Sequence, residues 1–136
     1  MATLEAELFS SGLPVEALME KAALALSRRI LALRHAKGAG WAPQQGVVVL
    51  VGPGHNGGDG LVVARELHLA GLPVRLWSPF DRRKPLTERH WNHARWLGIP
   101  CLAEAPAVDD GCLWIDALDR KSTRLNSSHT VISYAV

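Results

Sequence analysis

This chain has few cysteines, only a small excess of basic over acidic residues, and no long apolar run. The two cysteines, Cys101 and Cys112, lie without the second close pair that a zinc or dithiol redox site requires. The net charge is +2, and the 15 lysines and arginines are scattered, so composition gives no argument for nucleic-acid binding. No apolar run approaches the roughly 20 residues of a membrane helix, and the acidic start lacks the basic region of a secretory signal. We therefore expect a soluble, cytoplasmic protein that binds neither nucleic acid nor a membrane.

The spacing of apolar residues predicts alternating helices and strands. Apolar positions recur every three or four residues from Val15 to Leu33, on one face of a first helix. The run VVVLV at 47–51 predicts a strand buried on both faces, as in a parallel sheet. The other expected elements are strands at 72–78, 99–102 and 112–117, and helices over 61–70 and 87–97, capped by Gly71 and Gly98. This order predicts one α/β domain.

Residues 119–136 depart from this pattern. From Lys121 they read KSTRLNSSHTVISYAV, with a polar run where a further helix is expected. Since this stretch resembles translated sequencing-adaptor read-through, we expect a partial domain over 1–118 and a non-native tail over 119–136. Four strands are few for a doubly wound sheet, so we expect the natural domain to be longer.

The glycine-rich segment, residues 52–60 (GPGHNGGDG), follows the apolar strand. It lacks the lysine of a P-loop, and its GxGxxG spacing is weak support for a dinucleotide site because the next strand ends at Ser78 without a ribose-binding acid. We expect Asp59 to cap the following helix and to oppose a pyrophosphate. Two explanations remain: a tight turn, or a backbone opened for a ligand that meets the oxygens of Asn56 and Asp59. We favour the second because one or two glycines suffice for a turn.

Three stretches of the sequence resemble one known family. GPGHNGGDGLVVARELHLAG at 52–71 is similar to the GxGNNGGDG signature of the NAD(P)H-hydrate epimerase family, the YjeF N-terminal-type domain. LMEKA at 18–22 resembles the LMExA of its first helix, and WIDAL at 114–118 resembles its VDAxFG strand end. The resemblance covers about residues 10–118. His55 departs from the first asparagine of the signature, which bears on that side-chain contact alone.

The resemblance implies a fold and an activity. The implied fold is a Rossmann-like three-layer sandwich with a mostly parallel sheet and an N-terminal helix, incomplete in this chain. The implied activity interconverts the R and S epimers of hydrated NADH and NADPH (NADHX and NADPHX), for a dehydratase partner, fused in some members, that acts on the S form. A potassium ion is the implied cofactor, and a homodimer is a further expectation. The family's second glycine loop does not follow Leu118, so we expect this fragment to be impaired or inactive.

The resemblance also assigns roles to individual residues. It places substrate binding at five consecutive residues, His55, Asn56, Gly57, Gly58 and Asp59. Asp116 matches the family's catalytic aspartate, which also coordinates potassium together with the residue that matches Asn56. A strand-end carboxyl suits the loss and return of a hydroxyl group, although a loop anchor is the alternative for Asp116. Lys84 matches a lysine that assists the acid–base step or meets a phosphate, and its alternative is a solvated loop charge.

Two other functions remain open. The same domain resembles the dimerising, non-catalytic module of an mRNA-decapping scaffold protein, which would not need Asn56, Asp59 or Asp116. The presence of these three residues favours the enzyme. An ordinary NAD(P)-dependent oxidoreductase is the other alternative, and the missing ribose acid disfavours it.

Overall fold

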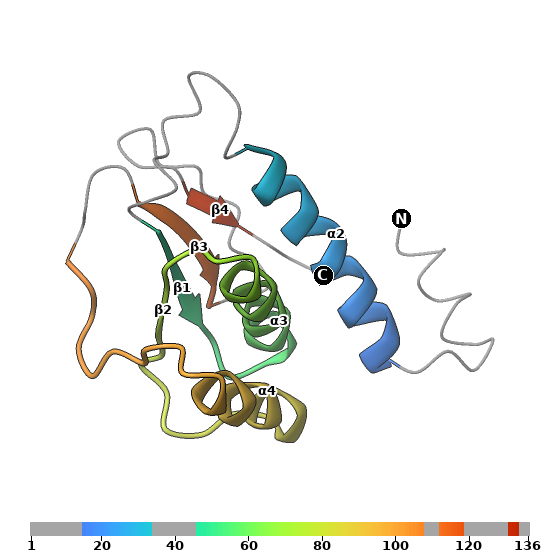
Figure 1. Ribbon diagram of the computed structural model, residues 1–136. Helices are drawn as coiled ribbons and strands as arrows, with labels where there is room; N and C mark the ends of the chain where they lie inside the picture. The colour runs from blue at the N-terminus through green and yellow to red at the C-terminus, as the bar shows by residue number, and fades with distance from the viewer. Residues whose placement is uncertain (1–14, 34–45, 108–111, 119–130, 134–136) are drawn as a thin grey trace.

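The computed structural model describes residues 15–33, 46–107, 112–118 and 131–133 (Figure 1). Its elements, in chain order, are α2 (Val15–Leu33), β1 (Val47–Val51), α3 (His55–Leu69), β2 (Val74–Trp77), α4 (Pro85–Trp96), β3 (Leu113–Ala117) and β4 (Val131–Ser133). The strands form one parallel sheet in the order β2-β1-β3-β4. The predicted α/β fold with a parallel sheet is confirmed.

The strand β1 is the centre of the sheet and of the core. Val47 pairs with Val74 of β2 on one side and with Leu113 of β3 on the other. Val47, Val48, Val49 and Val51 are each no more than 1% exposed. A run of β-branched residues fits this position because both faces of the strand are covered, so no polar face is needed.

The helix α3 lies between the sheet and the other two described helices. This helix packs against β1, β2 and β3, while α2 and α4 pack on α3 and flank it (Figure 1). The core lies between α3 and the sheet, where Val63 and Leu67 meet strand residues such as Val49 and Ile115. The second helical layer that a three-layer sandwich requires is not seen among the described residues.

Between residues 20 and 33, the first helix buries fewer of its apolar side chains than the sequence predicts. Ala23, Ser27 and Ile30 are buried, whereas Leu33, at the end of α2, is 42% exposed. The Ser27 hydroxyl donates to the Ala23 carbonyl at 2.8 Å, so its burial leaves no unpaired donor. An ion pair between Glu20 and Arg65 joins α2 to α3.

The prediction of a strand at residues 99–102 is wrong. Only one bridge forms there, between Leu76 and Cys101, with the Leu76 amide donating to the Pro100 carbonyl at 2.8 Å and the Leu102 amide donating to the Leu76 carbonyl at 2.7 Å. Proline has no N–H, so Pro100 cannot continue a ladder. This segment therefore covers the edge of β2 without extending the sheet.

The strand β4 falls within residues 119–136, which the sequence sets apart as a tail. Val131 pairs with Trp114, and Ser133 pairs with Asp116. The rest of the expected tail, 119–130 and 134–136, lies outside the described residues.

The ends of α3 and α4 follow local sequence signals. Gly71 and Gly98 have φ of +93° and +90°, a conformation that glycine adopts without strain. The Gly71 amide donates to His68, and the Leu72 amide donates to Leu67, which is the Schellman pattern. Both predicted glycine caps are thus confirmed.

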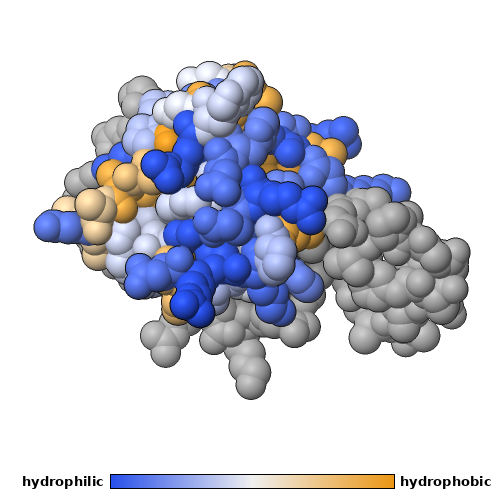
Figure 2. Space-filling model, turned by 90° about the horizontal axis from the view of Figure 1, so that it is seen from below, coloured by the Kyte–Doolittle hydropathy of each residue, from blue (hydrophilic) through white to orange (hydrophobic). Residues whose placement is uncertain are grey.

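The surface that carries α4 is largely hydrophilic (Figure 2). This helix fully buries only Thr87, Trp91 and Ala94, and its other residues are exposed or partly exposed. In the part of the chain that the structure describes, no helix has the length and apolar character needed to cross a membrane.

Candidate functional site

The glycine-rich segment and Asp116 meet at the carboxyl edge of the sheet. Leu50 of β1 pairs with Asp116 of β3, and Val51 pairs with Ala117. The Gly52 amide then donates to the Ala117 carbonyl at 3.0 Å. Because parallel strands end at the same edge, this is where an α/β sheet forms its ligand crevice.

Most of the glycine-rich segment is helical, which corrects the predicted helix start near residue 61. The helix α3 begins at His55, with Gly54 as N-cap in an extended conformation (φ −94°, ψ −161°). The Gly58 amide donates to the Gly54 carbonyl at 3.3 Å. Glycine costs a helix about 1 kcal/mol per residue relative to alanine, so the sequence alone disfavours a helix here. Tertiary packing overrides that preference.

The packing that requires glycine is visible at three positions. A Cβ at Gly57 would lie 1.9 Å from the Gly52 carbonyl oxygen, and a Cβ at Gly52 would lie 2.3 Å from the Leu118 carbonyl oxygen. A Cβ at Gly60 would lie 2.7 Å from the Ala117 side chain, where α3 crosses β3. The tight turn therefore explains Gly52 and Gly57, and the close approach of α3 to β3 explains Gly60. Gly54 differs, since a Cβ there would meet no atom within 4 Å.

Gly57→Ala should destabilise the chain, because the added Cβ meets a backbone carbonyl that no side-chain movement can clear. We expect a loss of about 3 kcal/mol in the free energy of unfolding, measured by chemical denaturation. Gly54→Ala is the matched control: its Cβ enters open space, and we expect a loss of at most about 1 kcal/mol, because alanine is a poorer N-cap than glycine. Equal losses in the two variants would contradict this steric account.

Asp59 is completely buried inside α3 and does not cap it, contrary to the sequence-based prediction. It lies one turn after His55, and the N-cap Gly54 has no side-chain cap. Neither carboxyl oxygen of Asp59 has a hydrogen-bond partner in the described structure, and the residue is 0% exposed. Burial raises the pKa of this carboxyl from 3.8 to about 7. This rise in pKa favours the neutral carboxyl, which weakens the predicted repulsion of an anionic ligand.

Asn56 is buried in the first turn of α3 at 3% exposure, whereas the neighbouring His55 is exposed. Of the substrate-binding residues predicted at 55–59, only His55 is therefore exposed, and the other four are buried. Their role in binding stays a prediction.

Asp116 is anchored at the end of β3. Its Oδ1 accepts a hydrogen bond from the Leu118 amide at 3.0 Å, which fixes the carboxyl at the strand end. Successive side chains of a strand point to opposite faces of the sheet. Ala117 approaches Gly60 of α3, so Asp116 lies on the face of β3 that is turned away from α3. Asp116 is half-buried.

Lys84 reaches the glycine-rich segment through its backbone. It is the N-cap of α4, and its amide donates to the Pro53 carbonyl at 2.8 Å, while its side chain is exposed. The predicted start of this helix at residue 87 is late by two residues, since Pro85 occupies the first turn. Proline suits that position, so this signal was present in the sequence.

Sequence reasoning missed two neighbours of Lys84. The Thr87 hydroxyl donates to the Gly54 carbonyl at 2.7 Å and is fully buried. The Arg83 guanidinium lies 3.9 Å from the centroid of the Trp91 ring and pairs with Glu88. The Thr87 contact has no signal in the sequence because it depends on how α4 docks, whereas the Arg83 contacts are local to the start of α4.

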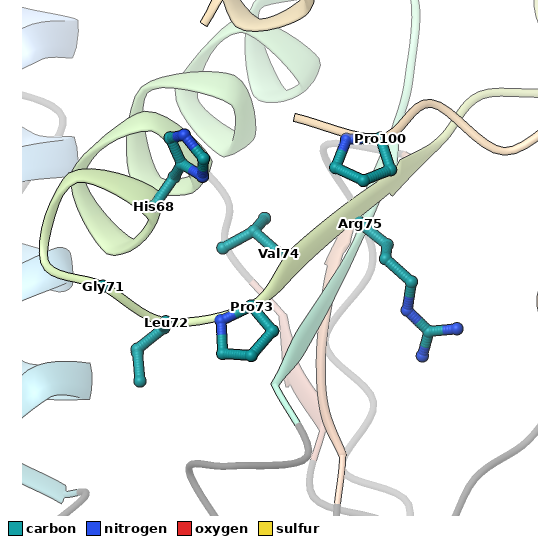
Figure 3. Close-up of a pocket in the computed structure, with 7 residues that line it drawn as sticks. All are labelled: His68, Gly71, Leu72, Pro73, Val74, Arg75 and Pro100. Carbon is teal, nitrogen blue, oxygen red and sulfur yellow. The ribbon is translucent and has the colours of Figure 1, made fainter. Parts of the chain in front are cut away.

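A hollow of about 400 Å³ lies at the other end of the molecule (Figure 3). Its lining comprises His68, Gly71, Leu72, Pro73, Val74, Arg75 and Pro100. Val74 points from β2 toward α3, and Arg75 points away on the other side of the strand (Figure 3). The hollow adjoins the amino end of β2 and the carboxyl end of α3, so it is separate from the candidate site.

Among the described residues, no group of three or more His, Cys, Asp and Glu side chains could hold a metal ion. A site with other oxygen ligands is compatible with this finding. Asn56 and Asp116 offer amide and carboxylate oxygens near one sheet edge, the ligand chemistry of hard cations such as potassium.

This chain is similar in sequence to one protein family and to several named proteins. Residues 15–133 match the family described as YjeF-related protein N-terminus. A bifunctional NAD(P)H-hydrate repair enzyme of a Synechocystis strain is 50% identical over 118 residues, which are 87% of this chain and 22% of that protein. An NAD(P)H-hydrate epimerase of Oenococcus oeni is 42% identical over 73 residues, covering 54% of this chain and 32% of that protein. The chain thus spans about a fifth of the length of the bifunctional relative.

The crystal structure of yeast ynu0, YNL200c, has the same fold. It superposes with a TM-score of 0.70 at 24% identity, and the match covers 93% of this chain and 57% of the yeast chain.

Proposed function

Since the chain belongs to the family of YjeF-related protein N-termini, we propose that it carries the epimerase part of NAD(P)H-hydrate repair, interconverting the R and S epimers of NADHX and NADPHX. The meeting of the glycine-rich segment with Asp116 at one sheet edge carries this proposal. In this proposal the dinucleotide lies along the first turn of α3, with its reactive ring at the strand end that carries Asp116.

Asp116 is the proposed acid and base. The carbon to be inverted bears a hydroxyl group next to a ring nitrogen, so its C–O bond can break when the hydroxyl leaves as water. The Asp116 carboxyl gives its proton to the departing oxygen, and the nitrogen lone pair stabilises the resulting cation. Water then attacks the opposite face of the ring, and its proton returns to the Asp116 carboxylate through intervening water. Atoms and charge balance, and no redox partner is required.

The supporting residues have separate proposed roles. Asn56 and Asp116 are the proposed potassium ligands, and the bound cation would supply positive charge beside the carboxylate. His55, Gly57, Gly58 and Asp59 complete the proposed substrate site. Lys84, exposed at the start of α4, is the proposed contact for the proton-transfer step or for a substrate phosphate.

The proposed partner is a dehydratase that acts on the S epimer, fused or separate. The bifunctional names of several relatives support it. A cytoplasmic location and a homodimer complete the proposal.

The test is the rate at which the chain converts purified R-NADPHX into a form that an S-specific dehydratase consumes. We expect conversion that depends on added potassium and exceeds the spontaneous rate, but that is slow because the family's second glycine loop does not follow Leu118. A rate equal to the spontaneous one would reject the epimerase function for this chain and favour a non-catalytic module.

A further inference from the structure

Helix α4 holds two consecutive carbonyl groups of the glycine-rich segment. The Lys84 amide donates to the Pro53 carbonyl at 2.8 Å, and the Thr87 hydroxyl donates to the Gly54 carbonyl at 2.7 Å. Thr87 is 0% exposed, so water does not compete for its hydroxyl. Both carbonyls are therefore held by α4, and the Gly54 carbonyl also accepts from the Gly58 amide of α3 at the longer distance of 3.3 Å.

The first turn of α4 is itself fixed in place. The Arg83 guanidinium donates to the Glu88 carboxylate at 3.0 Å and stacks 3.9 Å from the centroid of the Trp91 ring. The Arg83 side chain is only 8% exposed. These contacts tie the residue before the N-cap to the body of the helix, so Lys84 and Thr87 present their donors from a rigid support.

The carbonyl orientation determines where the neighbouring amides point. In a planar trans peptide the N–H is directed opposite to the C=O. Carbonyls of Pro53 and Gly54 that face α4 therefore turn the amides of Gly54 and His55 away from it. Gly54 borders open space, His55 is exposed, and the first-turn amides of α3 have no intrahelical acceptor. Successive amides with one orientation form a concave donor surface.

We propose that Thr87 is a positioning residue of the epimerase site. Its hydroxyl fixes the Gly54–His55 peptide so that the amides of the glycine-rich segment face the dinucleotide. Thr87 acts through the Gly54 carbonyl and does not touch the substrate. This inference rests on the proposed function and deepens it: Thr87 sets substrate affinity, whereas Asp116 carries the proton transfer.

Two substitutions at this position separate the hydroxyl from the shape of the side chain. Thr87→Val keeps the volume and loses the donor, while Thr87→Ser keeps the donor. We expect the KM for R-NADPHX to rise about tenfold in Thr87→Val, as loss of one buried hydrogen bond predicts, and to stay within about twofold in Thr87→Ser. The kcat should change by less than about threefold in both variants.

Ala94→Gly is the control for general weakening of α4. Ala94 is buried in the same helix, two turns from Thr87, and the added glycine lowers helix stability without touching the glycine-rich segment. We expect its KM to match that of the unmodified chain. A tenfold rise in this control, an unchanged KM in Thr87→Val, or an equal rise in Thr87→Ser would each overturn the inference.

A second measurement does not require activity. Hydrogen exchange of the Lys84 amide, which donates to Pro53, should accelerate about tenfold in Thr87→Val and remain slow in Thr87→Ser. Unchanged exchange in Thr87→Val would overturn the positioning role whatever the chain catalyses. If R-NADPHX is not converted at all while exchange responds as expected, the proposed function fails and the link between α4 and the glycine-rich segment stands.

Discussion

Asp59→Asn should stabilise the chain much more at pH 8 than at pH 4. The folded state holds a carboxyl with no exposure and no hydrogen-bond partner in the described structure, and burial raises its pKa from 3.8 to about 7. Between these two pH values the folded chain binds more protons at Asp59 than the unfolded chain does. Stability from this group is therefore present at low pH, falls as pH rises from about 4 to 7, and stays low above 7.

The size of this effect follows from the pKa difference. A shift of about three units corresponds to about 4 kcal/mol at 1.36 kcal/mol per unit. The gain in unfolding free energy on Asp59→Asn should thus be about 4 kcal/mol larger at pH 8 than at pH 4. Taking this difference cancels any cost of the buried amide that is common to both conditions.

Urea denaturation of the two chains across this pH range measures the effect. Asp81→Asn removes a carboxyl from the exposed turn before α4 and controls for the change in net charge. Parallel stability curves for the unmodified chain and Asp59→Asn would show that Asp59 is ionised or hydrated in solution.

Asp116→Asn should lower epimerisation of R-NADPHX by about 100-fold to 10,000-fold, the contribution of a positioned general acid or base. The amide cannot supply or take up the proton of the departing hydroxyl. It can still accept the hydrogen bond that the Leu118 amide donates to Oδ1, so the strand end should keep its conformation. The measured quantity is the rate of R-NADPHX conversion at saturating substrate, coupled to an S-specific dehydratase.

Thermal unfolding controls for loss of structure in Asp116→Asn. We expect its midpoint to stay close to that of the unmodified chain, because Asp116 is only half-buried. A rate within twofold of the unmodified chain would remove Asp116 from the proposed acid–base role and direct attention to Lys84, the other residue proposed for proton transfer.

Much of the candidate site could be predicted because it depends on strand order and strand ends. Once 47–51 and 112–117 are assigned as parallel strands, the glycine-rich segment and Asp116 must lie at the same edge. The prediction of a strand at 99–102 was wrong because the apolar pattern takes no account of Pro100, which has no N–H to donate to a neighbouring strand. The start of α3 failed because glycines disfavour helices in isolation.

The sequence by itself determined the α/β class, the buried strand β1 and the glycine caps at Gly71 and Gly98, since each depends on local periodicity or local backbone conformation. Only the tertiary structure decided that Gly57 and Gly60 sit in a helix, that Asp59 is buried without a partner, and that Thr87 binds the Gly54 carbonyl. The physical reason is distance along the chain. Gly60 meets Ala117, and Thr87 meets Gly54, across separations that no local pattern encodes.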